Sequence, residues 1–556
     1  MMHQAYSGLS RALSRYSPTS VGRVDFIFQP WVRKHSALNE GKIIQIPVTM
    51  ARTIKEAEIK KKKHEQERKM KLSRQGNKSV PIISCKRKEF NHYKGQSYSK
   101  FEEVPLASKG WHHYKSAGDY FTINSWGRNP AFEQVNDEPN DFDSLGLSKD
   151  MLTQITQLGF KIPTSIQALA IPHIMEGKNT LITAETGNGK TLAFLAPLLQ
   201  QIENYKKLTR DFPMNTPLGL IIVPGRELAE QIHAVASALG KDLEINVELI
   251  KGGRTKSLML HPKVREVHLL VATIGALSKL TTAGIYDTSL VRHIVVDEAD
   301  SLLDDSFSDI LIHYMSKFPI QGSQKEDSTT PITMSGIQLT LVSATMPRSL
   351  RTILDPLVNL QSLQRIDTPY LHRIQPHVPQ QFLRVNNVTK SAKLLELAEK
   401  CKTRGIPVII FSNFGKTSDW LSLFLNENGI PCVSLNGEMP AVVRNDQFRK
   451  FQDGEVIALS CTDLASRGLD TTKAGHVINF EFPQFISDYI HRCGRTGRVG
   501  SALTGMVTNL VHRRGEIELV KKIEYAVRKS EEFHNVNANI KRILVNTAVK
   551  DGESIE

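Results

Sequence analysis

Two short polar motifs carry the side chains best suited to chemistry. The first has glycines that let backbone N–H groups approach phosphate, a lysine that adds positive charge, and a threonine hydroxyl that can bind Mg²⁺. It reads Ala184-Glu185-Thr186-Gly187-Asn188-Gly189-Lys190-Thr191. Because Ala184 stands where such loops usually begin with Gly, and short glycine-lysine runs occur by chance, this motif alone is modest evidence for nucleotide binding.

The second motif is Asp297-Glu298-Ala299-Asp300, which directly follows the apolar run His293–Val296. An open parallel sheet binds its ligands at the carboxyl ends of its strands, which is where these carboxylates would lie. Asp297 suits a metal that bridges a triphosphate, and Glu298 suits the proton of an attacking water. An acidic helix start is the plain alternative, but the two motifs in this order predict Mg²⁺-dependent hydrolysis of a nucleoside triphosphate.

Short β-branched runs alternate with longer amphipathic segments from about residue 140 onward, which predicts parallel α/β architecture. The expected strands fall into two groups separated by Thr368-Pro369 and a connector containing Pro376 and Pro379. The first group is 180–183, 220–223, 269–272, 294–296 and 339–342, and the second is 408–411, 456–459, 477–480 and 506–508. Two sheets joined by a linker follow from this pattern. The polar stretch Gln321–Gly336 is expected to form a loop.

Further motifs spread over some 350 residues make the chain resemble the DEAD-box RNA helicases of superfamily 2. Phe142 with the stretch 159–167 resembles the adenine-reading Q motif, and Ser343-Ala344-Thr345 resembles the motif that couples the two lobes. Residues 462–470 and 489–498 resemble the last two motifs of the family. The likeness covers about residues 140–520. It implies an α/β fold of two tandem RecA-like lobes, each a parallel sheet covered by helices, behind a basic, partly disordered N-terminal extension.

The resemblance and the composition together divide the chain into six expected segments. They are a mitochondrial presequence (1–35), a basic extension (36–139), an ATP-binding lobe (140–367), a linker (368–380), a second lobe (381–530) and a tail (531–556).

The resemblance also implies roles for individual residues, with ATP and Mg²⁺ as cofactors. Catalysis falls to Lys190, Asp297, Glu298 and two arginine fingers, Arg495 and Arg498. ATP is bound by Phe142, Gln167, the loop 184–191 and Asp470, and Mg²⁺ by Thr191 and Asp297 through ATP and water. Coupling between lobes is assigned to Asp300, Ser343, Thr345, His491 and Arg492. RNA is bound by Pro224, Arg226, Gly252, Gly253, Thr273, Arg444 and Thr462.

Four positions depart from the family pattern, and all four belong to the motifs that bind RNA. Gly225 stands where Thr is usual, the stretch 273–276 reads Thr-Ile-Gly-Ala in place of Thr-Pro-Gly-Arg, and Ala441 stands where Gln is usual. The missing Arg at position 276 removes an expected phosphate contact. We therefore expect weaker RNA binding or unwinding, with nucleotide chemistry unaffected.

Composition bounds the class of protein. A chain of 556 residues is long enough for two or three domains, and its five scattered cysteines argue against a disulfide framework or zinc site. No apolar run is long enough to cross a bilayer. Residues 1–130 hold 25 Lys and Arg against 10 Asp and Glu, whereas the remainder holds 46 against 47. A basic extension on a nearly neutral motor favours a polyanionic partner such as RNA, or a targeting role.

The first 35 residues are rich in Arg, Ser and Tyr with one acid, Asp25, which is the composition of a mitochondrial presequence. A disordered basic tail is the alternative. The run Lys60–Lys63 lies among four Glu-before-Lys pairs at i,i+4, so a solvated charged helix, an RNA contact and nuclear import all remain open. The expected location is the mitochondrial matrix, with a secondary nuclear or nucleolar pool.

Within the family, Val104–Trp111 and the residue at position 276 most resemble a vertebrate mitochondrial member. This implies a monomeric RNA-dependent ATPase that opens RNA duplexes, with mitochondrial ribosomal RNA and large-subunit assembly proteins as partners. The alternative is a ribonucleoprotein scaffold or RNA clamp with weak ATPase activity. A processive DNA helicase is disfavoured by the Q motif and by the complete final motif.

Overall fold

In the computed structural model the described residues are 80–99, 101–133, 141–209, 212–253, 255–304, 307–321, 336–346, 354, 357–359, 362–463, 471–533 and 536. All of them belong to one compact unit, residues 79–556. The expected presequence, the lysine run, most of the loop 321–336, Asp470 and most of the tail lie outside these residues. Within them, none of the helices combines the length and apolarity that crossing a bilayer requires.

Lobe 1 is built on a seven-stranded sheet in the order β5-β6-β4-β7-β8-β3-β9, in which every pair is parallel. Its strands are short, and all but the edge strands β5 and β9 are almost wholly buried, as parallel strands covered on both faces must be. They are β3 (Thr180–Thr183), β4 (Gly219–Val223), β5 (Val247–Ile250), β6 (Leu269–Thr273), β7 (His293–Val296), β8 (Gln338–Ser343) and β9 (Gln364–Asp367).

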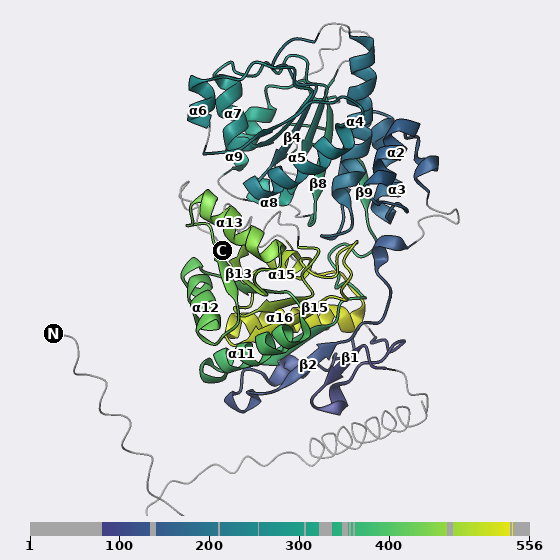
Figure 1. Ribbon diagram of the computed structural model, residues 1–556. Coiled ribbons are helices and arrows are strands. Elements are labelled where there is room, and N and C mark those ends of the chain that lie inside the picture. Colours follow the sequence, from purple (N-terminus) through teal and green to yellow (C-terminus); the bar gives the residue numbers. More distant parts are fainter. Residues whose placement is uncertain are drawn as a thin grey trace, which may run out of the picture. The chain divides into compact units, whose positions relative to one another are not determined.

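Alternate residues of these strands enter two separate cores. Ile221 and Val295 join the core beneath α3, α4 and α5, whereas Ile222 and Ile294 join the core beneath α7, α8 and α9. Helices therefore cover both faces of the sheet (Figure 1). The helices are α2 (Lys149–Gln157), α3 (Ser165–Met175), α4 (Lys190–Leu208), α5 (Arg226–Gly240), α6 (Thr255–Leu260), α7 (Ile274–Thr282), α8 (Ala299–Asp304) and α9 (Ser308–Met315).

Lobe 2 has an eight-stranded sheet in the order β1-β2-β10-β15-β14-β11-β13-β12. From β10 to β12 the pairs are parallel. The strands after the linker are β10 (Gln380–Arg384), β11 (Val408–Ser412), β12 (Cys432–Leu435), β13 (Ala458–Thr462), β14 (His476–Asn479) and β15 (Met506–Val511). The helices are α11 (Asn387–Arg404), α12 (Gly415–Glu427), α13 (Ala441–Gln452), α15 (Ile486–Cys493) and α16 (Arg514–Lys529).

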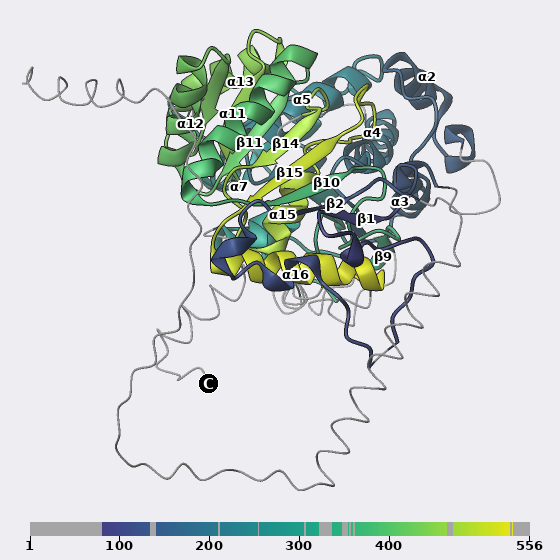
Figure 2. The ribbon, with the colours of Figure 1, turned by 90° about the horizontal axis from the view of Figure 1, so that it is seen from below.

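The first two strands of the lobe 2 sheet come from the N-terminal extension. β2 (Tyr120–Ile123) pairs antiparallel with β10, and β1 (Ile83–Cys85) pairs antiparallel with β2. Figure 2 shows both strands continuing the sheet beside β10, with α16 below them. Residues 83–85 and 120–123 of the extension thus belong to the sheet of lobe 2. Their single short strands carry too little periodicity to be read from sequence.

The predicted α/β class with two parallel sheets is confirmed. Most expected strands match to within a few residues, although residues 456–459 were placed two residues too early for β13 (Ala458–Thr462). The sequence pattern does not predict β5, β9, β10 or β12. Their polar or mixed compositions, such as Gln-Gln-Phe-Leu-Arg for β10, do not mark a buried strand.

Candidate functional site

The predicted phosphate loop joins β3 to α4. The loop turns tightly because Gly187 and Gly189 take left-handed backbone angles (φ +89° and +84°), and Gly189 caps the start of α4. The Lys190 ammonium folds over the loop, where its Nζ donates to the carbonyls of Ala184 (2.6 Å) and Glu185 (3.0 Å). Burial lowers the pKa of Lys190, against the pull of the Asp297 carboxylate that would raise it.

Two side chains at the start of α3 hold this loop. Thr164 Oγ1 donates to the Asn188 carbonyl (2.9 Å), and Gln167 Nε2 donates to the Gly189 carbonyl (3.0 Å). Gln167 Oε1 also accepts from the Thr164 N–H (2.9 Å), which completes a capping box. Gln167 thus supports the phosphate loop besides lining the cleft described below.

Asp297 and Glu298 follow the carboxyl end of β7, two strands away from β3. Asp297 Oδ1 accepts from the Glu298 N–H (2.8 Å), and burial, followed by the Glu298 charge, raises the pKa of Asp297 to about 7. Glu298 has a left-handed backbone (φ +49°), which is uncommon for a residue with a side chain. Its buried Oε2 atom has no hydrogen-bond partner among the described residues. Such geometry is typical of functional sites.

These residues line an open cleft with about 1000 Å³ of empty space. Both lobes contribute to its wall. Lobe 1 supplies Phe160, Ile162, Thr164, Gln167, Thr186, Gly187, Gly189, Lys190, Thr191, Leu228, Gln231, Asp297, Glu298 and Ala344, and lobe 2 supplies Thr472, Arg495, Arg498 and Val499. The cleft therefore brings together the predicted catalytic set, two cationic groups from the second lobe included.

The segment Gly494–Val499 of lobe 2 lies directly against the phosphate loop. The Val499 N–H donates to the Gly187 carbonyl (3.1 Å). A Cβ atom at Gly187 would lie 2.7 Å from Arg498 Cγ, and one at Gly494 would lie 1.3 Å from Thr186 Oγ1. Glycine at both positions is what permits this approach.

The predicted coupling residues meet beside the cleft, with one exception. Asp300 Oδ2 accepts from Thr345 N–H (2.9 Å) and Thr345 Oγ1 (2.6 Å), and it lies 3.3 Å from His491 Nε2 of lobe 2. Ser343 Oγ donates to the Thr345 carbonyl (2.5 Å). One buried carboxylate therefore joins the coupling motif of lobe 1 to α15 of lobe 2.

Arg492 is the exception, because its side chain bonds to residues of lobe 2. It forms two 2.6 Å contacts with the Asp463 carboxylate, donates to the Glu481 carbonyl (2.7 Å), and stacks on the Phe411 ring. Only 1% of the residue is exposed. Its geometry is that of a buried support for the end of β13, rather than of a contact between lobes.

Phe142 is also placed differently from the prediction. It is 5% exposed and packs in the core beneath α3 and α4, and it is not among the residues that line the cleft. Phe160, 39% exposed, and Ile162 form the apolar wall instead. The signal for them was present in sequence, since both stand in the Q-motif stretch just before Thr164. Asp470 lies outside the described residues.

The predicted RNA-binding residues of lobe 1 cluster because three neighbouring parallel strands end together. Pro224 and Arg226 follow β4, Gly252 and Gly253 follow β5, and Thr273 ends β6. The Arg226 guanidinium lies over the glycine pair, with Nη2 3.2 Å from the position of a Cβ atom on Gly252. The carboxyl ends of β4, β5 and β6, which form one edge of the lobe, thus present a cation beside exposed backbone. This arrangement suits binding of a phosphodiester.

In lobe 2, Thr462 ends β13 and Arg444 lies on α13. Arg444 Nε contacts Glu227 Oε1 of lobe 1 at 2.6 Å, and both side chains are largely buried (14% and 10% exposed). Arg444 is thus paired with a carboxylate. Ala276, where the family has Arg, is 3% exposed and belongs to the core beneath α7. The structure gives no support to the expectation that a side chain here would point to RNA.

Thr191 and Asp297 lie on the same cleft and offer oxygen donors, which fits Mg²⁺. In the part of the chain that the structure describes, no group of three His, Cys, Asp or Glu side chains could hold a metal unaided. An ion here would need oxygens from nucleotide and water, as is usual for Mg²⁺.

Comparisons with known proteins agree with this geometry. The DEAD/DEAH box helicase family matches residues 164–353, and the helicase conserved C-terminal domain matches residues 389–500. "Probable ATP-dependent RNA helicase DDX28" of Mus musculus is 37% identical, over 83% of this chain and 86% of that protein. Its Homo sapiens counterpart is 35% identical, over 83% and 87%.

Among solved structures, S. cerevisiae Dbp5 bound to RNA and ADP BeF3 matches with 25% identity and a TM-score of 0.58, covering 73% of this chain and all of the other. Mss116p bound to ssRNA and AMP-PNP shares the fold (TM-score 0.61, 24% identity, 72% and 80% covered). The chain has two lobes with a shared cleft, and its relatives match it along most of its length. It therefore belongs to the DEAD-box ATP-dependent RNA helicases.

Proposed function

We propose that ATP is hydrolysed in the cleft between the phosphate loop and the segment Gly494–Val499, and that hydrolysis requires both lobes. One observation carries this proposal: Lys190 and Glu298 of lobe 1 line the same cleft as Arg495 and Arg498 of lobe 2. Charge that develops on the γ-phosphate is best stabilised by cations already in place.

Each group has one task in this scheme. Lys190 leaves its loop carbonyls to bind the β- and γ-phosphates, and Glu298 orients the attacking water and accepts its proton. Mg²⁺, held by Thr191 and Asp297, would neutralise charge on the phosphates. For that, Asp297 must be ionised, although burial raises its pKa to about 7. Arg495 and Arg498 contribute as fingers from the second lobe.

RNA enters this scheme along the edge formed by Pro224, Arg226, Gly252, Gly253 and Thr273. An RNA strand that also contacts Thr462 of lobe 2 would favour the arrangement in which His491 meets Asp300. Binding energy from RNA would thereby be used to complete the ATP site. Opening of a short duplex follows if only one of its strands fits.

Mitochondrial ribosomal RNA during large-subunit assembly is the proposed substrate. Support comes from the presequence-like composition of residues 1–35 and from Val104–Trp111, which resembles a vertebrate mitochondrial member of the family. The two DDX28 helicases named above match 83% of this chain. A secondary nuclear pool gains no support from these relatives. A scaffold with weak ATPase activity is less favoured, because Lys190, Glu298, Arg495 and Arg498 all line the cleft.

The test is ATP turnover with and without mitochondrial ribosomal RNA, for the wild-type chain and Arg498→Ala. We expect RNA to stimulate the wild type, and Arg498→Ala to reduce stimulated turnover by about 10³-fold with little change in ATP affinity. Arg404→Ala, an exposed change on α11, is the matched control. Turnover that RNA does not alter in the wild type would support the scaffold instead.

A further inference from the structure

Residues 118–133, which we name the strap, touch lobe 2, the linker and lobe 1 in turn. At its start, Tyr120–Ile123 forms β2 against β10, and the Phe121 ring stacks on Phe382 with centroids 4.7 Å apart. The Gly118 N–H donates to the Arg384 carbonyl and the Arg384 N–H to the Asp119 carbonyl, both at 2.8 Å. This end is fixed to the sheet of lobe 2.

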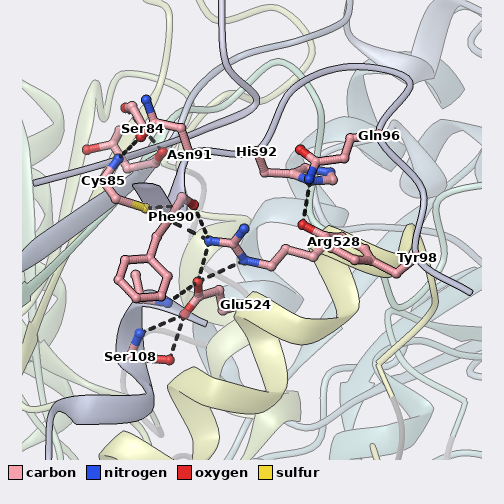
Figure 3. Close-up of polar contacts among 12 residues, drawn as sticks. Ser84, Cys85, Phe90, Asn91, His92, Gln96, Tyr98, Ser108, Glu524 and Arg528 are labelled. Atoms are coloured by element: carbon pink, nitrogen blue, oxygen red, sulfur yellow. Dashed lines mark hydrogen bonds and ion pairs between the residues drawn. The ribbon is translucent and has the colours of Figure 1, made fainter. Parts of the chain in front are cut away.

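The part of the extension that precedes the strap is bound to lobe 2 by a buried ion pair on α16 (Figure 3). Glu524 accepts hydrogen bonds from Ala107 N–H (2.8 Å), Ser108 N–H (3.0 Å) and Ser108 Oγ (2.6 Å). Arg528 pairs with Glu524 at 2.7 Å, and both side chains are 0% exposed. Arg528 also donates to the Phe90 carbonyl (2.7 Å). Burial of this kind holds only because nearly every polar atom is satisfied.

The middle of the strap runs along the linker between the lobes. The N–H groups of Trp126 and Gly127 both donate to the Pro376 carbonyl, at 2.9 and 3.3 Å. A Cβ atom on Gly127 would lie 3.1 Å from Pro376 Cβ, so the two backbones approach closely. The strap and the linker are therefore in contact over their central residues.

The far end of the strap is bound to lobe 1 at the start of α3. Ser165 Oγ lies 2.7 Å from the Glu133 carbonyl and 3.2 Å from the Ala131 carbonyl, and Ala131 is 2% exposed. Ser165 directly follows Thr164, whose hydroxyl holds the phosphate loop through the Asn188 carbonyl. Only one residue thus separates the end of the strap from the support of the ATP site.

We propose that the strap is a second mechanical connection between the lobes, which positions the phosphate loop through Ser165 according to where lobe 2 lies. Ser165 is then a positioning residue. The inference rests on the two-lobe ATP site proposed above. It adds that residues outside the helicase motifs tune that site.

The sharpest test lengthens the strap but leaves both ends attached. Six Gly and Ser residues inserted between Gly127 and Arg128 add up to about 20 Å of reach. The same insertion between Gly454 and Glu455, in an exposed turn of lobe 2, is the matched control. We expect the strap insertion to raise the KM for ATP and to lower RNA stimulation, each by about fivefold or more, with the control unchanged.

Ser165→Ala, which removes the lobe 1 attachment, should act in the same direction, and Ser165→Thr, which keeps a hydroxyl, should restore much of the loss. If the insertion prevents folding, the Ser165→Ala and Ser165→Thr variants test the role of the strap instead. The proposed role of the strap would be wrong if the strap insertion and Ser165→Ala both left the KM for ATP and the RNA stimulation at wild-type values. If RNA does not stimulate the wild type, the proposed function is wrong. The effect of the strap on the phosphate loop is then tested by the KM for ATP alone.

Discussion

In the ATP site, Lys190 is expected to serve ATP binding and Glu298 to serve hydrolysis. Lys190→Ala removes the phosphate counter-charge, so ATP affinity should fall. Glu298→Gln keeps the shape of the side chain but removes the proton acceptor, so turnover should fall by about 100-fold or more while ATP stays bound. Affinity for a fluorescent ATP analogue and turnover, measured on both variants, check this. Two variants with near-wild-type turnover would contradict the assigned roles.

Arg226 is the residue whose position best suits a phosphate contact with RNA. Because its guanidinium lies over Gly252 beside the ends of β4, β5 and β6, Arg226→Ala should weaken RNA binding for every sequence alike. The slope of log affinity against log salt concentration should fall by about one unit.

Arg292→Ala is the control for this measurement. Arg292 is exposed and directly precedes β7, at the amino end of a strand whose sheet binds at its carboxyl ends. A slope that changes equally in both variants would show that overall charge, and not this edge, determines RNA affinity.

Among the elements, α16 joins the N-terminal extension to lobe 2. Glu524→Ala leaves Arg528 buried without its carboxylate, and it removes the acceptor for Ala107 and Ser108. The free energy of unfolding should fall by about 3–5 kcal/mol. Urea unfolding followed by tryptophan fluorescence reports it, since Trp111 is buried beside this joint.

The double variant Glu524→Ala/Arg528→Met isolates the cause. Once the unpaired charge is gone, part of the lost stability should return. If the double variant is no more stable than Glu524→Ala, the loss comes from the backbone donors at residues 107 and 108, and the ion pair contributes little.

For the molecule as a whole, the sequence makes a prediction about location. Residues 1–35 fused to a reporter should carry it into mitochondria, because Arg11, Arg15 and Arg23 give the segment the charge that import needs. Changing these three to Glu should move the full chain out of mitochondria without altering its ATPase activity. A fragment of residues 50–80 tests the rival, nuclear import through Lys60–Lys63. An unchanged distribution of the charge-reversed chain would exclude the presequence.

The sequence by itself determined the lobes and the chemistry of the cleft. Phosphate loops and carboxylates at strand ends are local motifs, with spacings set by backbone geometry, so Lys190, Thr191, Asp297 and Glu298 could be identified without a structure. Parallel strands buried on both faces are apolar throughout, which is why β3, β4 and β6 were readable.

Only the tertiary structure decided which side chains face the cleft and which lie in a core. Phe142 and Phe160 are the same residue type, but packing beneath α3 and α4 buries the first and leaves the second on the cleft wall. Arg492 and Arg498 likewise belong to one motif, but Arg492 is buried in an ion pair with Asp463, whereas Arg498 lines the cleft. The place of β2 beside β10 depends on pairing between residues some 260 positions apart, and no local pattern encodes a contact of that range.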